Sequence, residues 1–69
     1  MTRAETLKAL RTEEAALRQR TAEKENLLAA AHSERNLGQI RYMAGVCTQM
    51  HRDLADLARR IKEVEAQPE

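Results

Sequence analysis

The sequence contains no phenylalanine and no tryptophan, and it has only one tyrosine, one proline, one cysteine and two glycines in 69 residues. The four aliphatic β-branched residues, Ile40, Val46, Ile61 and Val64, are too few to build a sheet. Alanine, leucine, glutamate, arginine, lysine and glutamine dominate instead, and these residues favour helices most strongly. We therefore predict a single all-α unit.

The lack of large side chains leaves little material for a core. A domain this short buries a small share of its surface, and such domains commonly add a disulfide, a metal or a second subunit. One cysteine cannot form an internal disulfide, and no set of residues has metal-ligand spacing. We expect no metal and no cofactor, so association is the remaining route to stability.

The charges nearly cancel, with 12 lysines and arginines against 11 aspartates and glutamates. No basic block or stripe stands out along the chain, so nucleic acid is not expected as a partner. No apolar run is long enough to span a bilayer, and no signal-peptide core follows Met1. A lone thiol fits a reducing compartment. The sequence predicts a cytoplasmic protein without a membrane partner.

The second half carries an unbroken heptad pattern, with apolar residues spaced alternately by three and four. This pattern predicts one long helix with a continuous apolar seam. The a positions are Ile40, Cys47, Leu54 and Ile61, and the d positions are Met43, Met50, Leu57 and Val64.

The first half has a rougher stripe, in which Glu14, Thr21 and Lys24 interrupt the apolar positions. The apolar members of this stripe are Leu7, Leu10, Leu17, Leu28 and Ala31. The step from 28 to 40 is not a multiple of seven, so one straight coiled coil would lose its seam between the two halves.

Helix-capping residues lie at the same place as the phase break. Asn36 followed by Gln39 forms a capping-box pattern, while Gly38 could instead be the left-handed C-cap of the preceding helix. Thr2 and Glu5 form a second capping box, and Pro68 stops the chain. We predict one domain over 1–69, with a helix over about 3–33, a turn over about 33–38 and a helix over about 37–66.

Folding the chain back at this turn pairs apolar residues along the two stripes. The predicted facing pairs are Leu7 with Val64, Leu10 with Ile61, Leu17 with Leu54, Leu28 with Met43, and Ala31 with Ile40. We therefore predict an antiparallel, coiled-coil-like helical hairpin.

Ala44, Val46 and Ala58 widen the apolar face of the second helix, which favours a homodimer that forms a four-helix bundle. The alternative is a monomer whose wide face binds a different protein.

Residues that could carry out chemistry are few. Cys47 occupies an a position, which is typical of a small buried hydrophobe, although a thiol near a dimer axis could also cross-link. His32 and His51 should lie far apart in the hairpin, so they should not share a metal. Neither histidine has a nucleophile arranged beside it for catalysis. We predict that the protein is not an enzyme.

Tyr42 stands out among the polar positions, because position c of the heptad points away from the hairpin seam. It lies beside Arg41, with Val46 one turn later and Gln49 beyond it. Tyrosine and arginine are enriched at binding hot spots, so these four residues form a hypothetical partner-binding patch. The simpler interpretation is a tyrosine that lies along the edge of the bundle with its hydroxyl in water.

A second candidate surface is acidic and comprises Asp53, Asp56, Glu63 and Glu65.

In its length and its composition rich in alanine, arginine and leucine, the chain resembles the small anti-quorum-sensing, anti-activator proteins of Mu-like phages. The segment that carries this resemblance is NLGQIRYMAGVCTQMHRDLADLARR (residues 36–60). The resemblance covers size and architecture and rests on no diagnostic motif. It implies a dimeric inhibitor in the host cytoplasm that binds a LuxR-type quorum-sensing transcription activator and blocks its binding to DNA. It also implies binding to the type IV pilus assembly ATPase. No site residue is carried over from it.

Three other classes of protein remain open. One is an RNA-binding hairpin dimer of the plasmid copy-control type, which would use Lys8, Arg11 and Arg18. The second is a small secretion-type co-chaperone that shields a helix of another protein. The third is a purely structural coiled-coil fragment.

Overall fold

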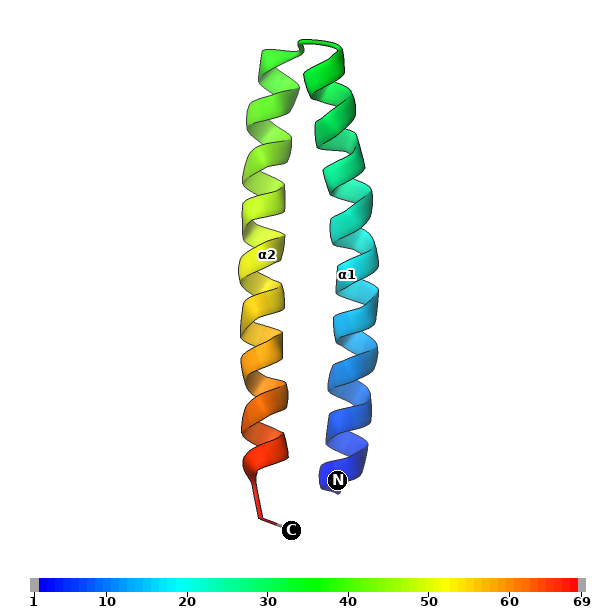
Figure 1. Ribbon diagram of the computed structural model, residues 1–69, viewed down its shortest axis with the longest axis vertical. Coiled ribbons are helices and arrows are strands. Elements are labelled where there is room, and N and C mark those ends of the chain that lie inside the picture. Colours follow the sequence, from blue (N-terminus) through cyan, green and yellow to red (C-terminus); the bar gives the residue numbers. More distant parts are fainter. Residues whose placement is uncertain (1, 69) are drawn as a thin grey trace.

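The computed structural model describes residues 2–68 as two antiparallel helices packed side by side along their whole length (Figure 1). Helix α1 spans Arg3–Ser33 and helix α2 spans Leu37–Ala66. The hairpin measures 52 × 15 × 13 Å, and both chain ends lie at the same end of it. The described residues contain no strand. The predicted all-α class and two-helix architecture are therefore confirmed.

Both helices begin at the capping residues that the sequence indicates. The Thr2 hydroxyl oxygen accepts a hydrogen bond from the Glu5 backbone N–H at 3.1 Å. The Asn36 side-chain oxygen accepts one from the Gln39 backbone N–H, also at 3.1 Å. Each bond satisfies an N–H that has no partner within its helix, which is why short polar side chains start helices. The prediction of Asn36 as an N-cap is confirmed.

The turn between the helices is a Schellman motif at the end of α1. Asn36 N–H donates to the Ala31 carbonyl and Arg35 N–H donates to the His32 carbonyl, both at 3.1 Å. The residue that takes the left-handed conformation is Arg35, with φ of 57°. The alternative prediction, that Gly38 is the left-handed C-cap, is wrong. Gly38 lies in the first turn of α2 because Asn36 already starts that helix.

Replacing Arg35 with glycine is expected to raise the free energy of unfolding by about 0.5–1 kcal/mol. Glycine adopts the left-handed conformation without the steric cost that a Cβ brings, and this gain exceeds its larger loss of chain entropy. Thermal unfolding followed by circular dichroism measures the effect. Arg35→Val is the matched control and should lower the melting temperature. A glycine variant that is less stable than the parent would contradict this account of the turn.

The core is a narrow seam between the helices. The buried apolar residues are Ala31, Met43, Cys47, Leu57 and Ile61, with 3–8% of their surface exposed. The other predicted core residues are half-buried, namely Leu7, Leu10, Leu17, Leu28, Ile40, Met50, Leu54 and Val64. No described side chain is less than 2% exposed. Two helices alone enclose little volume, so each inward residue keeps one side near solvent.

Thr21 is the one buried polar residue among those described, at 3% exposure. The sequence pattern treats it as an interruption of the α1 stripe. In the structure its hydroxyl donates to the Leu17 carbonyl at 2.7 Å, four residues earlier in the same helix. Because the hydroxyl is satisfied within α1, threonine can occupy an inward position without an unpaired polar group.

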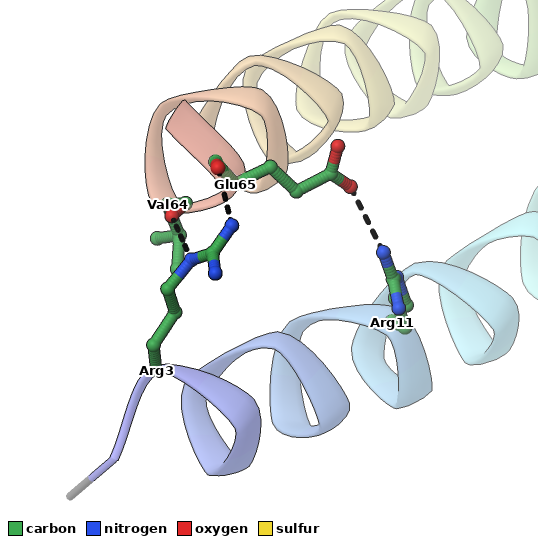
Figure 2. Close-up of polar contacts among 4 residues, drawn as sticks. All are labelled: Arg3, Arg11, Val64 and Glu65. Carbon is green, nitrogen blue, oxygen red and sulfur yellow. Dashed lines mark hydrogen bonds and ion pairs between the residues drawn. The ribbon is translucent and has the colours of Figure 1, made fainter. Parts of the chain in front are cut away.

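The open end of the hairpin is held by arginines of α1 (Figure 2). Arg3 Nε donates to the Val64 carbonyl at 2.9 Å, and Arg3 Nη2 donates to the Glu65 carbonyl. Arg11 Nη2 lies 2.9 Å from Glu65 Oε1. The last carbonyls of a helix have no partner within it and carry partial negative charge. Arg3 therefore caps the end of α2 from the neighbouring helix.

Substituting Arg3 with alanine should fray the last turn of α2 and cost about 1 kcal/mol of stability, because two charge-assisted hydrogen bonds to its carbonyls are lost. Amide hydrogen exchange should speed up in the last turn of α2 and stay unchanged near the hairpin turn. Lys8→Ala, which removes an exposed cation from the same helix, is the matched control. Equal exchange rates in the two variants would show that Arg3 does not hold this end.

Candidate functional site

Three residues of the predicted Tyr42 patch and two of the predicted acidic surface lie on one strip along α2. Tyr42, Val46, Gln49, Asp53 and Asp56 follow one another at spacings of four, three, four and three, so they share one side of the helix. We call these five residues the α2 edge strip. The remaining residue of the predicted patch, Arg41, lies next to Tyr42 on the outward side of the strip.

The end of the strip near the turn is apolar and open to solvent. Tyr42 is 67% exposed and Leu27 of α1 is 49% exposed, while Val46 is half-buried. Leu27 lies seven residues nearer the turn than Arg20, and Val46 lies seven nearer the turn than Asp53. Since Arg20 and Asp53 line the same groove, Leu27 and Val46 lie on the same edge of the hairpin. The sequence pattern does not single out Leu27.

Below this apolar end, a shallow groove of about 300 Å³ runs between the helices. Each helix contributes both negative and positive side chains to its lining. The lining residues are Glu13, Leu17 and Arg20 from α1 and Asp53, Asp56, Leu57 and Arg60 from α2. The edge therefore combines exposed apolar groups near the turn with a groove of both charges farther along. Such a mixed surface suits recognition of a protein, in which apolar anchors are surrounded by charged groups that set specificity.

Three of the four residues of the predicted acidic surface already have partners within the hairpin. Gln49 Nε2 donates to Asp53 Oδ1 at 2.9 Å, and Arg59 Nη2 lies 2.8 Å from Asp56 Oδ1. Glu65 lies on the other edge of the hairpin, where it is paired with Arg11. The structure thus divides the four residues between two edges, because Glu63, seven positions after Asp56, lies on the side of Asp53 and Asp56, away from Glu65. They do not form one free acidic patch.

The opposite edge of the hairpin carries a second ion pair between the helices. His51 Nε2 lies 2.7 Å from Glu25 Oε1, so the two residues link the middle of α1 to the middle of α2. Sequence reasoning missed this pair, although both residues follow inward heptad positions by one and therefore lie beside the seam. Cys47, one turn before His51, is a free buried cysteine with 6% exposure.

The described residues contain neither a cluster of metal-binding side chains nor a helix that could cross a membrane. No group of three or more histidine, cysteine or carboxylate side chains in residues 2–68 could hold a metal ion. Within that range no helix has the length and apolar character needed to cross a membrane.

Comparison with protein-family models, with curated protein sequences and with solved structures gives no match to this chain.

Proposed function

We propose that this chain is a non-enzymatic protein-binding module that captures a regulatory protein through the α2 edge strip and inactivates it. The observation that supports this most is the exposure of Tyr42, which is 67% open to solvent on the same edge of the hairpin as the exposed Leu27 and a groove of mixed charge. A tyrosine side chain has few rotatable bonds, so on a rigid helix it loses little conformational entropy when a partner buries it. The helices supply the rigidity, since both are capped.

We further propose that the working form is a homodimer in which two hairpins form a four-helix bundle. The hairpin exposes 5340 Å², whereas a compact monomer of 7.9 kDa exposes about 4,400 Å². The excess of roughly 900 Å² is close to the area of about 800 Å² that each partner buries in a standard interface. The half-buried flanking residues Val46 and Ala58 would be covered in such a bundle.

For the partner we propose, from the resemblance to anti-activator proteins of Mu-like phages, a LuxR-type transcription activator and the type IV pilus assembly ATPase. This assignment places the protein in the host cytoplasm. The RNA-binding alternative has less support, because two of its three cations already form ion pairs. Arg11 pairs with Glu65, and Arg18 Nη2 lies 3.6 Å from Glu14 Oε2.

A capture experiment tests the proposed function. The tagged chain and a Tyr42→Ala variant are incubated separately with bacterial lysate, and the retained proteins are identified by mass spectrometry. We expect one or a few regulatory proteins to be retained by the parent chain and lost with the variant. Equal retention by both chains would contradict a role for the strip.

Light scattering coupled to size exclusion tests the dimer separately. At micromolar concentration the parent chain should have twice the mass of the 7.9 kDa protomer. A monomeric mass would remove the four-helix bundle without affecting the capture result.

A further inference from the structure

The outward face of α2, turned away from α1, gathers cations that are scattered in the sequence. Exposed residues of this face follow one another at spacings of four and three from Arg41 to Ala66. In order they are Arg41, Gly45, Thr48, Arg52, Ala55, Arg59, Lys62 and Ala66. We call the four cations among them, Arg41, Arg52, Arg59 and Lys62, the basic ridge. No basic stripe stands out along the sequence, but the helical repeat aligns these cations, which lie three, seven and eleven positions apart.

Most of this positive charge is not used inside the hairpin. Arg41, Arg52 and Lys62 form no hydrogen bond or ion pair with any residue of the described range 2–68. Arg59 contacts Asp56 through one nitrogen at 2.8 Å, which leaves its other N–H groups available. The ridge itself contains no carboxylate, although Asp56 and Glu63 lie along one side of it.

Gly45 gives a second, independent reason to examine this face. It lies in the interior of α2, where glycine costs about 1 kcal/mol relative to alanine. Its φ is not positive, and a Cβ placed on it would meet nothing within 4 Å. The hairpin therefore does not require glycine here. A glycine on an exposed helix face lets another backbone approach closely. Thr48 and Ala55, which lie between the cations on the same face, also have short side chains and leave room for such an approach.

We propose that the outward face of α2 is a second docking surface, distinct from the α2 edge strip, and that it binds an acidic helix of another protein. Carboxylates of that helix pair with the basic ridge, and its backbone approaches over Gly45, Thr48 and Ala55. The ridge is about 32 Å long at 1.5 Å per residue, which is the length of an ordinary helix of about 20 residues.

The charge distribution favours a protein helix over a nucleic acid. Duplex DNA carries one negative charge per about 1.7 Å, so a tract as long as the ridge would present many more phosphates than four cations can neutralise. A helix with a few carboxylates on one face matches the number and spacing of the cations better.

Binding of a synthetic helix tests this proposal with the whole chain. The probe is an alanine-rich peptide of about 25 residues with glutamates on one face, and its twin has lysines in place of the glutamates. We expect the acidic peptide to bind and the basic twin not to bind. Arg52→Glu with Arg59→Glu should weaken binding at least about tenfold, because like charges then face each other. Lys8→Glu, an exposed cation of α1, is the control and should leave binding within about twofold.

The Gly45→Ala variant distinguishes an effect on peptide binding from an effect on the stability of the hairpin. It should raise the melting temperature, because alanine favours the helix, and it should weaken the acidic peptide about fivefold, because the Cβ keeps the second backbone away. A chain that is stabilised but binds equally well would overturn the close-approach part of the proposal. No binding of the acidic peptide, or preferential binding of duplex RNA, would overturn the docking surface as a whole. Neither outcome depends on Tyr42, so the capture experiment with Tyr42→Ala remains a separate test.

Discussion

A Leu57→Ala chain is expected to lose about 2–3 kcal/mol of its free energy of unfolding and to melt roughly 10–20 °C below the parent. Leu57 is 4% exposed and is one of five buried apolar residues in the described range 2–68. Removing its side chain leaves a cavity that neighbours cannot fill, since the half-buried residues around it are held by their own helices. A domain of this size has a free energy of unfolding of only about a few kcal/mol, so this substitution removes most of it.

Thermal unfolding followed by far-ultraviolet circular dichroism measures this loss. Leu37→Ala is the matched control, because the same side chain is removed at a position that is 69% exposed. That control should stay within about 0.5 kcal/mol of the parent. Similar melting temperatures for the two variants would show that the seam between the helices is not what stabilises the protein. Because a dimer would melt at a concentration-dependent temperature, all chains are compared at one concentration.

Tyr42→Ala is expected to weaken binding of a captured partner at least about 30-fold while leaving the helix content unchanged. The ring is exposed and makes no hydrogen bond with another residue of the described chain, so its loss removes little from the hairpin. A buried aromatic anchor at an interface contributes about 2 kcal/mol or more, which corresponds to that change in Kd.

Isothermal titration with the purified partner gives the Kd, and circular dichroism gives the helix content. Tyr42→Phe tells the ring from the hydroxyl: if the ring is the anchor, this variant should bind within a few-fold of the parent. Leu37→Ala removes another exposed apolar side chain that lies outside the α2 edge strip, and it should bind normally. Loss of helix content in Tyr42→Ala would assign the tyrosine a structural role instead.

Much of the local structure could be read from the residues alone. The heptad spacing of α2 identifies an inward stripe whose members are buried or half-buried in the structure, from Ile40 to Val64. The cap at Asn36 was also predictable, because a short polar side chain must satisfy the first free N–H groups of a helix. These features depend on neighbours a few residues away, which is the range over which a sequence pattern is informative.

The sequence was less informative where two local rules competed. The sequence offered Asn36 as the N-cap of the second helix and Gly38 as the C-cap of the first, because glycine is the usual residue in the left-handed conformation. The structure places Arg35 there, since the N-cap bond of Asn36 determines where α2 starts and leaves Gly38 inside it. Thr21 likewise interrupts the apolar stripe of α1 in the sequence, but the structure buries it because its hydroxyl donates to the Leu17 carbonyl.

By itself, the sequence determined that this protein is helical, where each helix begins, and which stripe of each helix faces inward, because these follow from residues within one or two turns of each other. Only the tertiary structure decided which side chains meet across the hairpin. Arg3 over the last carbonyls of α2, His51 beside Glu25, and Leu27 on the same edge as Tyr42 all join residues far apart in the chain. Their meeting depends on the rotation and relative height of two packed helices, which no spacing along one chain specifies.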